Sequence, residues 1–156
     1  MVQIGGNHEI FLQFSLILFS LFLYLRSNSN PFMKKKLLLI VEAMGGGVRR
    51  HVVDLINGLD KSQFTITLLY GKRRADASFL AQIQALEKEA QLIGSDNLVR
   101  ELSPKQDYAA LKEIKNVIRE VQPDIVHCHS SKAGVLGRLA AKQMHIKKIF
   151  YTPHAY

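Results

Sequence analysis

The 156-residue sequence predicts an α/β domain, a Rossmann-like three-layer sandwich around a mostly parallel sheet. Short apolar or β-branched segments alternate along the chain with longer segments whose apolar residues recur every three or four positions. Three glycines, Gly45 to Gly47, separate the first such pair, as at a tight turn from strand to helix. This alternation favours parallel strands joined by right-handed crossovers.

The first half of the chain predicts two strands and two helices. Residues 37–41 are all apolar and predict a buried strand, and helical spacing of apolar residues after the glycines predicts a helix over 48–59. Residues 64–70 are rich in β-branched and aromatic side chains, which predicts a second strand. Residues 79–90 carry apolar side chains on one side only, which predicts a helix with a polar face.

The second half continues the alternation. Short strands are expected over residues 91–94 and 97–102, followed by a helix over 108–121 that Pro123 ends. Residues 124–129 and 148–152 predict two further strands, with a helix over 132–144 between them that Ser130 and Ser131 can cap. Ligands of such sheets gather at the carboxyl ends of the strands, so the loops there are expected to form the site.

Composition narrows the functional classes. The net charge is +8, from 21 Lys and Arg against 13 Asp and Glu, which indicates either a solvated basic surface or attraction to phosphates, anionic lipid or nucleic acid. Aromatic residues do not interleave with the basic clusters, so nucleic-acid binding ranks last. Cys128 is the only cysteine, which excludes a disulfide within one chain and favours a reducing, cytoplasmic compartment.

An apolar leader precedes the predicted domain. Residues 10–25 are nearly all apolar, somewhat fewer than the roughly 20 that a membrane helix needs. The alternatives are a membrane anchor, a signal peptide, which lacks its basic start and cleavage site here, and translation that truly begins at Met33. We favour the last and expect a leader over 1–32 and a domain over 33–156.

The glycine turn is a candidate phosphate site, because backbone N–H groups at a helix start attract anions. The alternative is a tight turn without a ligand. Arg50 stands where the dinucleotide fingerprint G-x-G-x-x-G needs its third glycine, and no P-loop sequence occurs in the chain. Neither a dinucleotide oxidoreductase nor a P-loop NTPase is therefore supported.

Histidines mark the predicted carboxyl edge. His127 and His129 alternate on one strand and should point to the same face, His127 into the core and His129 at the strand end beside Ser130, Ser131 and Lys132. This polar group suits a ligand hydroxyl, which an imidazole can orient or deprotonate. His154 repeats the pattern on the neighbouring strand. No further ligand cluster has the spacing of a metal site, so no metal is expected, and His51 is either a surface residue or part of the site.

Three stretches together resemble the amino-terminal domain of family 4 glycosyltransferases, which are retaining enzymes of the GT-B fold. They are GGGVRRHVVDL at 45–55, PDIVHCHSSKAG at 123–134 and YTPH at 151–154. The resemblance implies two Rossmann-like domains facing a cleft, the amino-terminal one binding the acceptor and the other the sugar nucleotide. It also implies no metal cofactor, with which the absence of any D-x-D pair agrees.

The resemblance also implies roles for single residues. Gly45, Gly46 and Gly47 would approach the donor diphosphate, and His129 would be the catalytic residue. The acceptor-binding residues would be Ser130, Ser131, Lys132 and His154. The implied partners are a nucleotide sugar, a sugar or lipid-linked acceptor in surface polysaccharide or glycolipid synthesis, and an anionic membrane surface on which the protein is peripheral or anchored.

The donor-binding domain is not among these residues, and the last predicted strand has no covering helix after it. We therefore expect the domain to be incomplete at its carboxyl end, to need a further donor-binding domain, and to be inactive or very weak by itself. The alternative is a non-catalytic α/β binding module, tethered to a membrane by residues 10–25.

Overall fold

The computed structural model describes residues 33–154. The leader predicted over residues 1–32, with its apolar run, lies outside the described residues. Within the part that is described, no helix combines the length and the apolar character needed to cross a bilayer.

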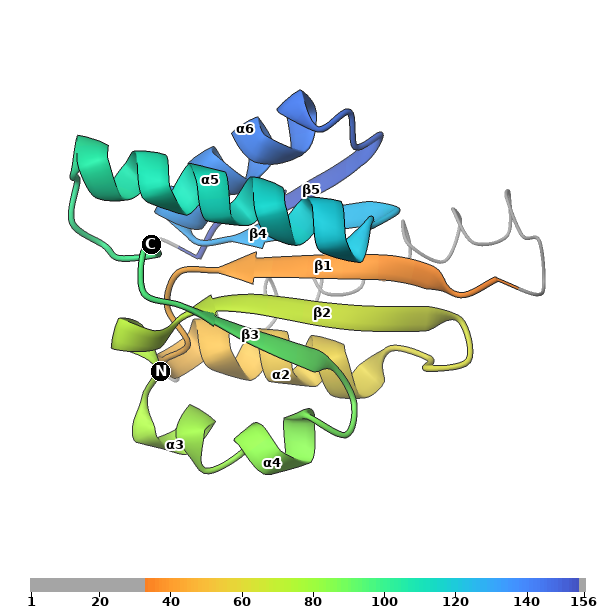
Figure 1. Ribbon diagram of the computed structural model, residues 1–156. Helices are drawn as coiled ribbons and strands as arrows, with labels where there is room; N and C mark the ends of the chain where they lie inside the picture. Colours follow the sequence, from red (N-terminus) through yellow and green to blue (C-terminus); the bar gives the residue numbers. More distant parts are fainter. Residues whose placement is uncertain (1–32, 155–156) are drawn as a thin grey trace, which may run out of the picture. The chain divides into compact units, whose positions relative to one another are not determined.

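Five parallel strands form one sheet in the order β3-β2-β1-β4-β5 (Figure 1). The strands are β1 (Lys35–Val41), β2 (Phe64–Gly71), β3 (Gln91–Ser95), β4 (Ile125–His129) and β5 (Lys148–Thr152). The order runs outward in both directions from β1, so the chain changes direction between β1 and β4. In open α/β sheets this switch point, at the carboxyl ends of the strands, is where ligands bind. The predicted α/β class is confirmed.

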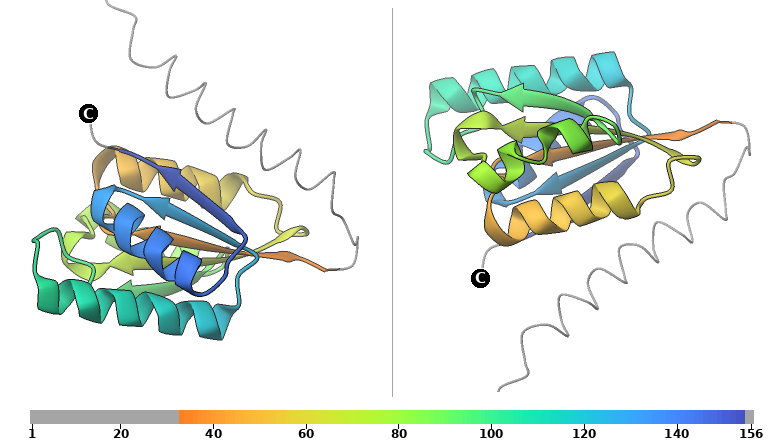
Figure 2. Two further views of the ribbon diagram at one scale, coloured as in Figure 1. Left: turned by 90° about the horizontal axis from the view of Figure 1, so that it is seen from above. Right: turned by 90° about the horizontal axis from the view of Figure 1, so that it is seen from below.

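Helices cover both faces of the sheet (Figure 2). The helix α2 (Gly46–Gly58) lies on one face, and α5 (Pro104–Val121) and α6 (Ser131–Gln143) pack against each other on the opposite face. The chain between β2 and β3 forms a short 3-10 turn, η1 (Lys72–Arg74), and two one-turn helices, α3 (Ala77–Leu80) and α4 (Ile83–Leu86). This is the three-layer arrangement that the sequence predicts.

The central position of β1 in the sheet explains why its sequence is apolar without interruption. Leu38, Leu39, Ile40 and Val41 are all fully buried, because helices cover both faces of the sheet at β1. Burying side chains of this size contributes roughly 1.5–3 kcal/mol each. The strand is therefore tightly packed, and it positions the loop that follows it at the carboxyl edge.

The helix predicted over residues 79–90 is wrong as one element. The Asp76 side chain caps α3 by accepting a 2.7 Å hydrogen bond from Phe79 N, and the helical ladder then breaks where Gln82 N bonds to Phe79 O. Phe79 and Leu86 are both buried, two turns apart, and that spacing mimics a continuous amphipathic helix.

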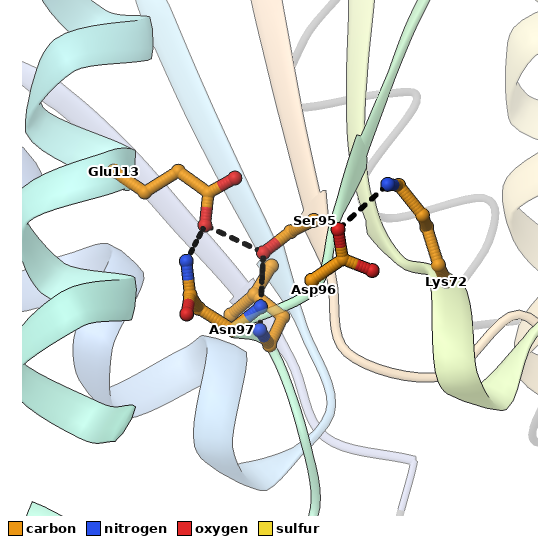
Figure 3. A network of polar contacts seen from close by, with 6 residues as sticks. Lys72, Ser95, Asp96, Asn97 and Glu113 are labelled. Atoms are coloured by element: carbon orange, nitrogen blue, oxygen red, sulfur yellow. Dashed lines mark hydrogen bonds and ion pairs between the residues drawn. The ribbon is translucent and has the colours of Figure 1, made fainter. Parts of the chain in front are cut away.

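The strand predicted over residues 97–102 is also wrong. The chain leaves the sheet after Ser95, whose hydroxyl accepts hydrogen bonds from the backbone of Asn97 and Leu98 and donates one to Glu113, 2.7 Å away (Figure 3). Leu98 is buried under this turn, so an apolar pattern arises without strand pairing. The next helix starts earlier than predicted, at Pro104 behind the capping Ser103.

Candidate functional site

The candidate site lies at the carboxyl ends of β1, β4 and β5. The strand register places His129 between Val41 on one side and Thr152 on the other. Because all three strands are parallel, the chain that leaves each of them emerges at the same edge. The glycine turn after β1 and the start of α6 after β4 thus meet at the switch point of the sheet.

His127 and His129 share one face of β4, as the alternation predicts, and their ring centroids are 4.0 Å apart. His127 is buried, and its Nε2 lies 2.8 Å from the Thr152 hydroxyl. Burial is the main cause that lowers the pKa of His127 to about 3, with His51 and His154 adding to it. His127 is a neutral core histidine whose ring packs against that of His129.

His129 ends β4 and is fully buried. Its Nδ1 lies 3.1 Å from Nε2 of His154, whereas its own Nε2 is buried without a hydrogen-bond partner among the described residues. Desolvation, reinforced by the neighbouring histidines, holds the pKa of His129 well below 6.5. The ring is therefore neutral near pH 7, and one buried nitrogen remains for a ligand.

A third histidine reaches the same place from the other side of the glycine turn. The His51 ring, in the second turn of α2, has its centroid 5.4 Å from that of His129 and 5.1 Å from that of His154. One nitrogen from each of these three rings lies within 4.8 Å of the other two. Burial lowers the pKa of His51, although Asp54 opposes this, and it lowers the pKa of His154 to about 4. We call His51, His129 and His154 the histidine cluster.

Ser130 holds a strained backbone beside the cluster. Its φ of 66° and ψ of 166° lie in a region that residues other than glycine rarely adopt and that costs roughly 1–3 kcal/mol. Its hydroxyl is buried without a hydrogen-bond partner in the described part of the chain. The hydroxyl does not cap α6, so the predicted capping role is wrong for Ser130. Ser131 follows it, exposed, as the first residue of the helix.

Lys132 is buried and held by protein groups. Its Nζ lies 2.5 Å from Oδ1 of Asp107 and also donates to the carbonyl of Glu101. The ion pair joins the start of α6 to the start of α5. No pattern in the sequence predicts this pairing, because Asp107 has the position of an ordinary acidic residue in the first turn of a helix.

The glycine turn is exposed to solvent, and its backbone already binds the side-chain carboxylate of Asp76. Gly46 has a φ of 54°, and a side chain at Gly46 or Gly47 would meet nothing within 4 Å. Asp76 Oδ2 accepts hydrogen bonds from Gly46 N at 3.3 Å and from Arg49 Nε at 3.2 Å. Asp76 was not predicted as a residue of this edge, although an acidic residue shortly after the second strand is a weak signal for it.

The loops after β1 and β2 are tied together next to the glycine turn. Glu42 is buried, and its carboxylate lies 2.6 Å from Nη1 of Arg74. Gly71 packs so closely that a Cβ there would lie 2.2 Å from the carbonyl oxygen of Glu42. Glu42 is thus a structural residue, and the edge around the histidine cluster is built on close backbone contacts.

Sequence comparison supports the resemblance seen in the motifs. The sequence model of Glycosyltransferase Family 4 matches residues 45–156, most of the chain. EpsD of Bacillus subtilis, which carries the name of a glycosyltransferase, is 45% identical over 53 residues, 33% of this chain and 14% of its own length. The UDP-Gal:alpha-D-GlcNAc-diphosphoundecaprenol alpha-1,3-galactosyltransferase of Escherichia coli is 27% identical over 110 residues, 70% of this chain and 27% of its own. The matched part is therefore about a quarter or less of each relative.

Solved structures confirm the fold. MurG of Acinetobacter baumannii matches with a TM-score of 0.57 at 14% identity, over 76% of this chain and 35% of its own. UDP-GlcNAc 2-epimerase of Neisseria meningitidis matches with a TM-score of 0.54 at 16% identity, over 74% and 31%. With the family match spanning the glycine turn, the histidine strand and the last strand, the chain belongs to glycosyltransferase family 4.

Proposed function

We propose that this chain forms the acceptor side of a retaining glycosyltransferase, which moves a sugar from a nucleotide sugar to an acceptor hydroxyl. The observation that carries the proposal is the family match, which covers every loop at the carboxyl edge from Gly45 to His154. The arrangement at the switch point supports it, because a glycine turn for an anion and neutral imidazoles for a hydroxyl lie at one edge of the sheet.

His129 is the proposed catalytic residue. Its buried Nε2 has no hydrogen-bond partner among the described residues, and leaving such an atom unpaired costs roughly 1–3 kcal/mol. A neutral imidazole nitrogen can accept the hydrogen bond of an acceptor hydroxyl and orient that hydroxyl for attack. Acceptor binding is thus expected to satisfy a group that folding leaves unsatisfied.

Ser130, Ser131 and His154 are the proposed acceptor contacts around His129. The Ser130 hydroxyl is buried and unpaired within the described residues, and His154 is hydrogen-bonded to His129. Lys132 was expected to contact the acceptor as well, but its ammonium already has partners in Asp107 and the Glu101 carbonyl. We propose that Lys132 acts as a positioning residue that fixes the start of α6.

The donor diphosphate is proposed to approach Gly45, Gly46 and Gly47. The backbone N–H of Gly46 faces Asp76, so a phosphate would take the place of that carboxylate at the positive end of α2. These groups supply few of the donors that a diphosphate needs. We therefore propose that a further domain holds most of the nucleotide sugar and that residues 1–156 alone do not turn it over.

The name of the Escherichia coli relative suggests the class of acceptor: a sugar linked by diphosphate to a long polyprenol. We propose an acceptor of this lipid-linked class, in surface polysaccharide or glycolipid synthesis, reached by peripheral association with an anionic membrane surface. The net charge of +8 supports such association. Cosedimentation with phosphatidylglycerol vesicles, but not with phosphatidylcholine vesicles, is the expected result, and equal binding to both would contradict it.

Acceptor binding tests the proposal directly. A water-soluble short-chain polyprenyl diphosphate carrying GlcNAc is titrated calorimetrically into the full chain and into His129→Asn. Binding is expected to weaken by at least about tenfold in the variant, because the hydrogen bond to Nε2 is lost. The matched control is His145→Asn, which changes an exposed histidine outside the cluster and should bind as the parent does. Absence of saturable binding, or equal affinity in both variants, would contradict the proposal.

Turnover tests the need for a further domain. The full chain is incubated with radiolabelled UDP-galactose and the same acceptor, and no transfer above background is expected. Transfer by the 156-residue chain at rates normal for an enzyme would overturn this part of the proposal.

A further inference from the structure

The histidine cluster brings together three imidazoles from three separate elements. His51 comes from α2, His129 from the end of β4, and His154 from the segment that follows β5. One nitrogen of each ring lies within 4.8 Å of the other two. Three imidazoles that meet at one sheet edge form a set of nitrogen atoms of the kind that transition metals bind.

The distances fit a shared ion. His129 Nδ1 and His154 Nε2 are 3.1 Å apart. Two nitrogens bound at about 2.0–2.1 Å to one tetrahedral ion lie roughly 3.3 Å from each other, so this pair already has the required separation. Binding an ion would replace their mutual hydrogen bond and turn the two rings so that both lone pairs point to the ion. The third nitrogen needs an approach of about 1.5 Å at most by the same geometry, within reach of a rotation of the half-buried His51 ring.

The donor set selects the class of ion. All three candidate ligands are imidazoles, and each offers one nitrogen to a common point. Neutral imidazole suits zinc, copper, nickel and iron, whereas magnesium and calcium prefer oxygen ligands. Among residues 33–154 the cluster supplies three histidine ligands, so a tetrahedral ion there keeps one coordination position open.

The surroundings support His129 as a ligand. His127 packs against its ring at 4.0 Å and is itself fixed by the Thr152 hydroxyl at 2.8 Å. The acidic Asp54 acts on His51, and its negative charge favours a cation at this edge.

We propose that His51, His129 and His154 bind one divalent transition-metal ion of the zinc class, with a fourth position open to water or an oxygen ligand. The proposal goes beyond sugar transfer and does not depend on it. One consequence does rest on the proposed function: an ion here occupies the histidines assigned to the acceptor, so zinc is expected to weaken acceptor binding.

Metal binding is measured on the full 156-residue chain after treatment with EDTA and dialysis. Calorimetric titration with zinc chloride is expected to show one tight site per chain. Cobalt(II) is expected to give the intense visible absorption of a four-coordinate nitrogen site. His51→Asn and His154→Asn should each weaken zinc binding by at least about tenfold, since one of three ligands is lost.

His145→Asn is the matched control, because His145 is exposed and lies outside the cluster, and it should retain the site. His154 belongs to no helix or strand, so its variant keeps the test valid if His51→Asn fails to fold, as circular dichroism would show. No zinc binding in the parent, or binding that His154→Asn retains in full, would overturn the metal site. If zinc binds at the cluster but does not weaken acceptor binding, that result would instead contradict the proposed function.

Discussion

Acid should destabilise this domain through His127. The residue is 3% exposed and hydrogen-bonded to Thr152, and burial lowers its pKa to about 3 from the ordinary value of 6.5. The unfolded chain takes up a proton on this residue below 6.5, whereas the folded chain does not. The stabilising contribution of neutral His127 is therefore complete above 6.5 and is lost progressively as the pH falls from 6.5 toward 3.

The size of the effect follows from the two pKa values. Between about pH 7.5 and about pH 5, protonation of the unfolded chain at His127 lowers the free energy of unfolding by about 2 kcal/mol. That is a large share of the roughly 5–15 kcal/mol available to a domain. The other buried histidines add to the total loss, so the share of His127 must be isolated with a variant.

The variant His127→Gln isolates the contribution of His127 to the acid-induced loss of stability, because a glutamine amide can keep the hydrogen bond to the Thr152 hydroxyl and does not titrate. Urea unfolding at both pH values, with EDTA present, should show a loss of stability on acidification about 2 kcal/mol smaller than in the parent. His145→Asn should lose as much as the parent. If His127→Gln is destabilised by acid as strongly as the parent, the assignment of a neutral core role to His127 is refuted.

Two further predictions concern packing next to the site. Gly71→Ala should lower the free energy of unfolding measured in urea by about 3 kcal/mol, since its Cβ would lie 2.2 and 2.4 Å from the backbone oxygens of Glu42 and Leu98. The control Gly58→Ala has open space around its Cβ and should be neutral or stabilising. A Gly71→Ala variant as stable as the parent would rule out this close approach. Burial raises the pKa of the Cys128 thiol to about 12, so a disulfide reagent should label it only as fast as the chain unfolds, and rapid labelling of the folded protein would show that the thiol is accessible.

Local patterns in the sequence are enough to predict most of the elements. The sequence predicted all five strands of the sheet and the helices α2, α5 and α6, because continuous or periodic burial restricts the choice of residues. The two failures share one cause. Phe79 and Leu86 are buried in two separate one-turn helices, and Leu98 and Val99 are buried in irregular chain. A pattern of burial does not reveal which backbone hydrogen bonds accompany it.

The sequence predicted which residues lie at the end of each strand, but not which of them meet in the folded chain. Alternation along β4 correctly placed His127 and His129 on one face, and the glycine turn was recognised as a helix start. Which side chains meet there depends on strand order and register, and these follow from the packing of the whole sheet.

By itself, the sequence determined the layered α/β fold and the motifs by which the chain resembles its family, because both are written in short stretches of residues. Only the tertiary structure brought His51 and His154 to His129, placed Asp76 at the glycine turn, and paired Lys132 with Asp107. Those contacts join elements far apart along the chain. They depend on burial and desolvation at one shared edge, which no local pattern encodes.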